Sequence, residues 1–199
     1  MILDELKDVH YSIFMNSYGF SNYTKRINMA FSKIDQSSID KVLSVLNQSF
    51  ESGARIWIAG NGGSAATASH FATDLSRCKN SKYETIKGIS LCDNSGLITA
   101  ISNDFGYEYI FSRQLSNLAT SGDLLIVLSA SGNSKNILEV LEWAKNNQVK
   151  TIALTGFDGG EANKIADISI HIPTEIGDYG VAEDTHSIIC HFLSSQFKK

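Results

Sequence analysis

Two groups of polar residues in this 199-residue chain have the types and spacing to do chemistry. His70 and Asp74 are four residues apart in a segment with helical character, so their side chains share one face of a helix. A carboxylate and an imidazole suit proton transfer near neutral pH, and the same two groups can bind a divalent metal. A solvated polar helix surface is the alternative interpretation of this pair.

The second group is the segment 129–134, SASGNS, which offers three serine hydroxyls directly after an apolar run. It contains no Lys or Arg, so a bound phosphate would depend on neutral donors and on the start of the following helix. The free N–H groups and partial positive charge of a helix N-terminus attract anions. Serine is also a favoured N-cap, so an ordinary helix cap is the alternative.

A glycine-rich loop at 60–64, GNGGS, resembles neither the P-loop nor the dinucleotide-binding pattern, so it does not predict nucleotide binding. Taken alone it is typical of a tight turn between a strand and a helix. Both loops follow predicted strands, and ligands of open α/β sheets bind at the carboxyl ends of the strands. The sequence therefore places both loops where a ligand site is expected.

The elements that must position these loops alternate between strand and helix, which predicts a parallel sheet with helices on both faces. A helix is expected before Gly53, with Ser37 or Ser38 as its N-cap. A C-terminal helix from about Val181 to Phe197 would carry His186 and His191. Strands are predicted at 55–59, 86–91, 123–128, 151–154 and 168–172, and further helices at 64–78, 94–102, 106–119 and 134–147.

Composition narrows the function classes. The net charge is -4, the pI is near 5.7, and no long basic run occurs, so nucleic-acid binding has no electrostatic support. The longest clearly apolar run, Leu124–Leu128, is far shorter than a membrane span, and the acidic N-terminus does not resemble a secretory signal. Three cysteines without a CxxC pair indicate reduced structural thiols. We therefore expect a cytoplasmic protein that binds neither nucleic acid nor membrane.

The two loops, in this order and spacing, resemble the SIS (sugar isomerase) domain family over nearly the whole chain. Five stretches are similar to the phosphoheptose isomerases of that family: GNGGS at 60–64, HFA at 70–72, NDFG at 103–106, SGNS at 131–134 and LTG at 154–156. The resemblance implies a single SIS domain over 1–199, with an N-terminal helical arm over about 1–52. It further implies a flavodoxin-like, doubly wound parallel sheet and a homotetramer with active sites at the subunit interfaces.

The resemblance also implies a reaction: isomerisation of sedoheptulose 7-phosphate to D-glycero-D-manno-heptose 7-phosphate through an enediol, for surface heptose. Asp74 would be the catalytic base and His191 its acid/base partner. One zinc per subunit would be held by His70, Asp74, Glu183 and His191. The residues implied to bind the substrate are Asn61, Gly62, Gly63, Ser64, Asp74, Asn103, Asp104, Ser129, Ala130, Ser131, Ser134 and Glu183.

Three residues depart from the family pattern: Asp74 replaces the usual glutamate, Glu183 the usual glutamine and Ala130 the usual threonine. We interpret the first two as altered ligands of a related subgroup. Glu183 and His191 are eight residues apart, about 12 Å along a helix axis, so both reach one zinc only if Glu183 extends from the helix start. Asp178, Asp184 and His186 are the alternative partners.

Two other functions stay open from the sequence. One is a non-catalytic SIS protein that binds a phosphosugar as a regulator or adaptor, and the other is an isomerase of a different phosphosugar. A regulator would keep the serine loop without needing His70, Asp74 and His191. The joint presence of these three residues favours the enzyme, because isomerisation needs both an acid and a base.

Overall fold

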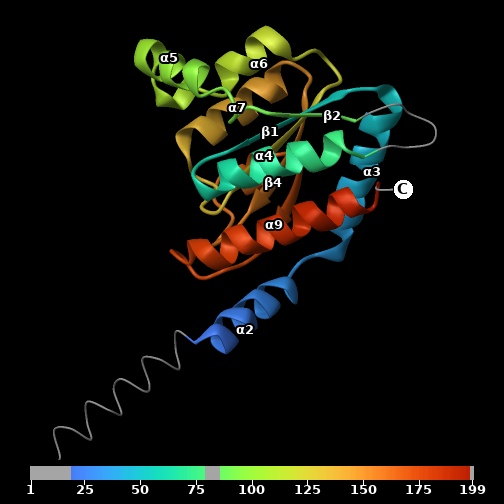
Figure 1. The fold of residues 1–199 in the computed structure, drawn as a ribbon, viewed down its shortest axis with the longest axis vertical. Coiled ribbons are helices and arrows are strands. Elements are labelled where there is room, and N and C mark those ends of the chain that lie inside the picture. Colours follow the sequence, from blue (N-terminus) through green and yellow to red (C-terminus); the bar gives the residue numbers. More distant parts are fainter. Residues whose placement is uncertain (1–18, 79–85, 198–199) are drawn as a thin grey trace, which may run out of the picture.

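The computed structural model describes residues 19–78 and 86–197 (Figure 1). Part of the predicted N-terminal arm, residues 1–18, lies outside this range. Among the described residues no helix is both long and apolar enough to cross a membrane.

The centre of the molecule is a five-stranded parallel sheet with the strand order β2-β1-β3-β4-β5. This order is the flavodoxin-like arrangement of a doubly wound sheet, so the predicted fold class is confirmed. The parallel pairing places Gly60, the last residue of β1, beside Leu128 of β3. The strands are β1 (Arg55–Gly60), β2 (Lys87–Ser90), β3 (Leu124–Ser129), β4 (Lys150–Thr155) and β5 (Ile168–His171).

Helices cover both faces of the sheet, and each face has its own apolar core. Because the central strand β3 is buried along its whole length, its side chains serve both cores alternately. One face carries α2 (Phe20–Phe31), α3 (Gln36–Ser52), α4 (Gly63–Ser76) and α9 (Tyr179–Ser195). The other carries α5 (Ser95–Phe105), α6 (Ser112–Leu118), α7 (Lys135–Asn146) and α8 (Ala162–Ile165), with a short 3-10 helix at Tyr107–Tyr109.

The start of α3 corrects one prediction. Its N-cap is Asp35, where the sequence pattern favoured Ser37 or Ser38. The Asp35 carboxylate accepts the Ser37 backbone N–H at 3.0 Å and also accepts the hydroxyls of both serines. A single acidic side chain thus satisfies the helix start, and the two serines become its donors. The predicted end is confirmed, since Gly53 has the left-handed backbone (φ 70°) of a helix C-cap.

A buried carboxylate fixes the edge of the sheet opposite the two loops. Asp123 accepts the backbone N–H groups of Arg55 and Thr120 and the indole N–H of Trp57, each at 3.0 Å. These bonds set the register of β1 against β3 at their amino ends. The same register determines how the loops at their carboxyl ends meet.

Candidate active site

The two polar loops meet at the carboxyl edge of the sheet, because β1 and β3 are neighbours. Between them lies a cavity of about 100 Å³. Its lining joins both loops to the start of α9, and consists of Asn61, Ser64, Leu128, Ser129, Ala130, Ser131, Ser134, Tyr179 and Glu183. Seven of the predicted substrate-binding residues, Glu183 among them, therefore line one cavity.

The hydroxyls of the serine loop are arranged to donate. Ser129 Oγ accepts the Gly132 N–H at 3.1 Å, and Ser131 Oγ accepts the Asn133 N–H at 3.2 Å. A hydroxyl that accepts one bond keeps its proton for a ligand. Ser134 stands at the N-cap position of α7, yet its side chain makes no capping bond. Ser134 therefore does not act as an ordinary N-cap, because the hydrogen bond that defines one is not formed.

Gly132 locks the serine loop against the turn after β4. Its φ is +64°, and an added Cβ would overlap the carbonyl oxygen of Gly159. The Gly132 carbonyl accepts the Ala162 N–H at 2.9 Å, and the Asn133 side chain accepts the Glu161 N–H at 3.0 Å. The loop is held by its backbone, so its hydroxyls stay available for a ligand.

The glycine loop opens the start of α4 to the cavity. The N-cap of α4 is Gly62, which has no side chain to bond the first N–H groups of the helix. A Cβ added at Gly63 would overlap the carboxylate of Glu183. Both α4 and α7 thus begin at the cavity without a side-chain cap, an arrangement that favours a bound phosphate.

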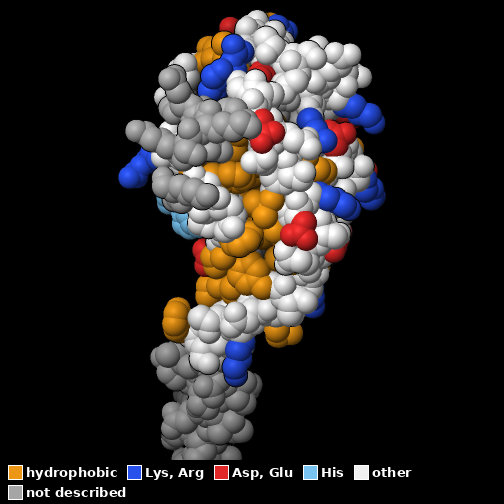
Figure 2. All heavy atoms as spheres, turned by 90° about the vertical axis from the view of Figure 1, so that its right-hand side faces the viewer, with side chains coloured by type: hydrophobic (Ala, Val, Ile, Leu, Met, Phe, Trp, Pro, Cys, Tyr) orange, Lys and Arg blue, Asp and Glu red, His pale blue; other side chains and the backbone are white. Residues whose placement is uncertain are grey.

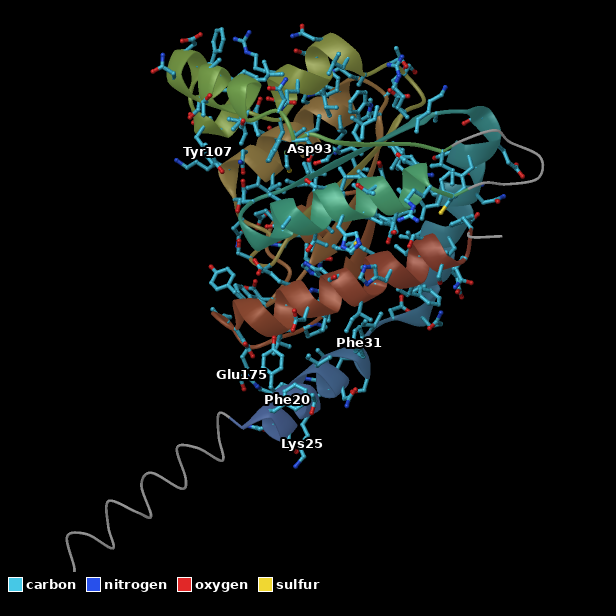
Figure 3. All side chains as sticks on the ribbon, in the orientation of Figure 1. Phe20, Lys25, Phe31, Asp93, Tyr107 and Glu175 are labelled. Carbon is cyan, nitrogen blue, oxygen red and sulfur yellow. The ribbon has the colours of Figure 1, made fainter. Side chains whose placement is uncertain are left out.

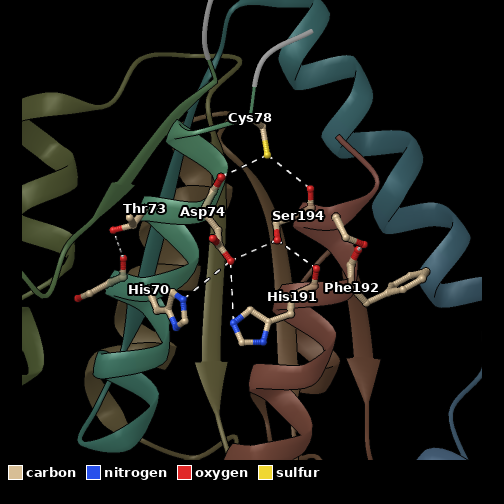
Figure 4. Close-up of polar contacts among 9 residues, drawn as sticks. His70, Thr73, Asp74, Cys78, His191, Phe192 and Ser194 are labelled. Atoms are coloured by element: carbon tan, nitrogen blue, oxygen red, sulfur yellow. Dashed lines mark hydrogen bonds and ion pairs between the residues drawn. The ribbon is translucent and has the colours of Figure 1, made fainter. Parts of the chain in front are cut away.

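Helices α4 and α9 both begin at the cavity and run side by side away from it (Figure 1). Between them, His70 and Asp74 of α4 face His191 of α9 (Figure 4). Asp74 Oδ2 lies 4.0 Å from His70 Nε2 and 3.9 Å from His191 Nε2. The two imidazole rings meet edge to face with centroids 4.8 Å apart. The predicted pair on one helix face is confirmed, and α9 adds His191 to it.

The carboxylate of this cluster is shielded while the imidazoles are open. The Asp74 side chain is 12% exposed, against 57% for His70 and 51% for His191. The Ser194 hydroxyl is shared between Asp74 Oδ2 at 3.4 Å and the His191 carbonyl at 3.1 Å, and the Cys78 S–H is shared between the carbonyls of Asp74 and Ser194 (Figure 4). These bonds tie α4 to α9 at the level of the cluster and orient the carboxylate.

The cluster fits a divalent metal. The ligand atoms of His70, Asp74 and His191 all lie within 4.8 Å of one another. Two imidazole nitrogens and a carboxylate oxygen are a common donor set of catalytic zinc. Zinc–ligand bonds of about 2.1 Å in a tetrahedron separate the donor atoms by about 3.4 Å. The distances to Asp74 exceed this by about half an ångström, and no pair of ligand atoms exceeds it by more than about 1.4 Å, so side-chain rotations would close the site around a metal.

Glu183 lies outside this cluster of possible metal ligands in the described part of the chain. Its carboxylate rests against Gly63 at the cavity. The three alternative partners have other contacts or locations. Asp184 accepts the Tyr23 hydroxyl, Asp178 is paired with Arg26, and His186 is buried in the interior.

Asn103 and Asp104 are exposed near the end of α5, on the opposite face of the sheet. The Asn103 side chain donates to Asp104 at 2.9 Å, and neither residue lines the cavity. One subunit therefore does not bring these two predicted substrate contacts to the site. That Asn103 and Asp104 contact the substrate stays a prediction, as does the formation of the active site between subunits.

Several site residues were not predicted from the sequence. Ser194 and Cys78 hold Asp74, and Tyr179 lines the cavity. Asn136 of α7 bonds Asn61 in the glycine loop. The sequence offered a weak indication of two of these residues. Cys78 follows Asp74 by four residues and Ser194 follows His191 by three, so each could share a helix face with a predicted site residue.

The fold and the two loops define a class of phosphosugar-binding domain. Residues 19–156 match the model of the SIS domain, and the chain belongs to this family.

Its relatives narrow the class to the phosphoheptose isomerases. The chain is 41% identical to a phosphoheptose isomerase of Aliarcobacter butzleri over 158 residues, which cover 79% of this chain and 82% of that protein. It is 35% identical to a probable phosphoheptose isomerase of Thermoplasma volcanium over 192 residues, 96% and 95% of the two chains. A solved phosphoheptose isomerase from Francisella tularensis superposes with a TM-score of 0.83 at 27% identity, covering 94% of this chain and 98% of that one.

Proposed function

We propose that this protein isomerises sedoheptulose 7-phosphate to D-glycero-D-manno-heptose 7-phosphate and thereby supplies heptose for surface polysaccharides or glycoproteins. The observation that carries the proposal is the pairing of a phosphate-binding cavity with an acid–base cluster along the same two helices. His70 follows Ser64 by six residues, about 9 Å along the axis of α4. In an open-chain sugar with a terminal phosphate, the reacting carbons lie at the end opposite to the phosphate. The distance between the cavity and the cluster therefore suits such a substrate.

Different residues bind the phosphate and transfer the protons of an aldose–ketose isomerisation. The serine loop and the starts of α4 and α7 hold the phosphate through neutral donors. Asp74 takes the proton from one carbon of the substrate, and the proton returns to its neighbour through the enediol. His191 exchanges a proton with the adjacent oxygens, a role for which an exposed imidazole is suited. Ser194 keeps the Asp74 carboxylate turned toward both histidines.

Zinc is the metal we propose for the cluster, held by His70, Asp74 and His191 with an open position for substrate. When bound, it would polarise the substrate carbonyl as a Lewis acid. The further contribution of Glu183 to the metal, suggested by the family resemblance, remains a prediction, since its carboxylate lies at the cavity.

We further propose a homotetramer. A groove between α2, α3 and α9 is apolar and open to solvent (Figure 2), with Ile188 46% and Phe192 43% exposed. Large apolar patches of this kind favour a protein partner. The cytoplasmic location stays a prediction from the sequence.

The test is incubation of the purified protein with sedoheptulose 7-phosphate and added zinc, followed by NMR of the products. We expect an aldose 7-phosphate to appear. Asp74→Asn, which keeps the shape of the side chain, should lower kcat at least about a hundredfold, because general base catalysis typically contributes this much. Asp40→Asn, an exposed carboxylate of α3, is the matched control. Unchanged substrate after long incubation would refute the proposal.

The same experiment separates the two competing functions. A regulator or adaptor would bind the ketose phosphate without converting it, and its affinity would survive Asp74→Asn. An isomerase of another phosphosugar would turn over a ketose phosphate of different length faster than sedoheptulose 7-phosphate. Comparing kcat/KM across several ketose phosphates distinguishes the second case.

A further inference from the structure

A pair of side-chain amides, one half-buried and one buried, connects the glycine loop to the start of α7 behind the serine loop. Asn61 of the glycine loop donates from Nδ2 to Asn136 Oδ1 at 2.9 Å. Asn136, the second residue of α7, donates back from its own Nδ2 to Asn61 Oδ1, also at 2.9 Å. Asn136 is only 2% exposed, so it cannot touch a ligand in the cavity itself. Its effect on a ligand must pass through Asn61.

A third side chain completes the arrangement from the opposite face of the sheet. Tyr107, in the 3-10 helix after α5, donates its hydroxyl to Asn61 Oδ1 at 2.9 Å. Its ring is 53% exposed and lies at the end of the molecule where the loops meet (Figure 3). Three elements far apart in the sequence thus converge on the amide of Asn61.

The hydrogen-bonding capacity of Asn61 follows from this count. A side-chain carbonyl has two lone pairs, and those of Asn61 are both used, by Asn136 and Tyr107. An amide NH2 has two protons, and Asn136 takes only one of them. One N–H therefore remains, on a residue that lines the cavity together with the serine hydroxyls.

We propose that Asn136 and Tyr107 are positioning residues that fix Asn61 as a hydrogen-bond donor toward an oxygen of the bound phosphosugar. This inference rests on the proposed function for the identity of the ligand. A donor in this position selects an acceptor, either a phosphate oxygen, a carbonyl oxygen or a hydroxyl that accepts. The free N–H of Asn61 and the hydroxyls of the neighbouring serines are thus all hydrogen-bond donors toward the cavity.

Rotating both amides by 180° gives the competing arrangement. The reciprocal pair survives such a rotation, but Tyr107 would then accept from Asn61, and a lone pair of Asn61 would face the cavity. Asn61 would then select a donor from the ligand. Solvent exchange of the two Asn61 amide protons separates the two arrangements, because both protons are bonded only in the rotated one.

The first experiment is a kinetic double-mutant cycle with sedoheptulose 7-phosphate. Tyr107→Phe removes one hydroxyl at the surface, and we expect KM to rise about fivefold, equivalent to about 1 kcal/mol, with kcat within about twofold. Tyr109→Phe, in the same 3-10 helix, is the matched control and should leave both constants unchanged. In an Asn61→Ala background Tyr107→Phe should have no further effect, because Tyr107 acts through Asn61. An additive effect would show direct contact between Tyr107 and the substrate and overturn the proposal.

The second experiment does not depend on turnover. In ¹⁵N-labelled protein, the two side-chain amide protons of Asn61 are assigned and their exchange with solvent is measured. We expect one protected and one exposed proton, and the protected one should stay protected in Tyr107→Phe. Two protected protons in the parent, one of them released by Tyr107→Phe, would establish the rotated arrangement and refute the inference. A protein that fails to convert the ketose phosphate would overturn the proposed function, while this measurement still decides the inference.

Discussion

Burial of His186 gives the structure a pH dependence that can be measured. Its ring is fully enclosed within the fold, and neither ring nitrogen has a hydrogen-bond partner among the described residues. Burial lowers the pKa of His186 to about 4, with a smaller opposing effect from the Thr155 backbone and a smaller lowering effect from His171. The folded protein therefore keeps this imidazole neutral well below the ordinary histidine pKa of about 6.5.

The sign of the effect follows from proton binding. Below about pH 6.5 the unfolded chain protonates His186 while the folded chain does not, so stability falls as the pH drops toward 4. Each pKa unit corresponds to about 1.4 kcal/mol, so about 2 kcal/mol is lost between pH 7 and pH 5 from this residue. His186→Leu removes the titrating group and fills the same buried space with apolar atoms. The pH-dependent loss should therefore be about 2 kcal/mol smaller in the variant than in the parent.

The assay is urea unfolding followed by circular dichroism, at pH 7 and pH 5, with both proteins at the same concentration. Equal concentrations matter because association between copies would add to the apparent stability. The m-values must agree between the two pH values for the free energies of unfolding to be compared. A variant that loses as much stability as the parent between pH 7 and pH 5 would show that His186 is not held neutral by burial.

Three further predictions concern the site. Gly132→Ala should lower the free energy of unfolding by about 3 kcal/mol or more, seen as a lower Tm, because left-handed backbone strain of about 1–2 kcal/mol adds to the overlap with Gly159. Ser134→Ala should leave the Tm nearly unchanged, since no capping bond is lost, yet raise KM about tenfold through one lost bond to a charged phosphate. Metal analysis should find about one zinc per subunit in the parent and far less in His70→Ala, and equal zinc in both would exclude the histidine as a ligand.

Much of the fold was predictable because local patterns and neighbouring strands determine it. The predicted strand at 123–128 is observed one residue later, at Leu124–Ser129, and all five predicted strands are found. The predicted N-cap of α3 was wrong because Asp35, Ser37 and Ser38 are all suitable caps, and their spacing alone does not rank them. The structure resolves the choice, since only Asp35 accepts bonds from both serines.

The site was predictable only where one element carries it. The i,i+4 spacing of His70 and Asp74 is local, so their shared helix face followed from the sequence. His191 reaches them from α9, 117 residues after Asp74, and only the family resemblance placed it there. Ser194 and Asn136 were missed for the same reason, because each is a small polar residue whose partner is distant in sequence.

The departures from the family pattern can now be judged by geometry. Aspartate is one methylene shorter than the usual glutamate, yet Asp74 Oδ2 lies within 4.0 Å of both imidazoles and within 3.4 Å of the Ser194 hydroxyl. The shorter acid therefore still reaches its partners, because α4 and α9 are tied together at this level by Cys78 and Ser194. Glu183 lies eight residues before His191, which is about 12 Å along the axis of α9. It therefore faces the cavity and not the cluster of Asp74 and the two histidines. Aspartate in place of the usual glutamate thus preserves the cluster of Asp74 with the two histidines, whereas glutamate in place of the usual glutamine at position 183 adds a carboxylate to the cavity.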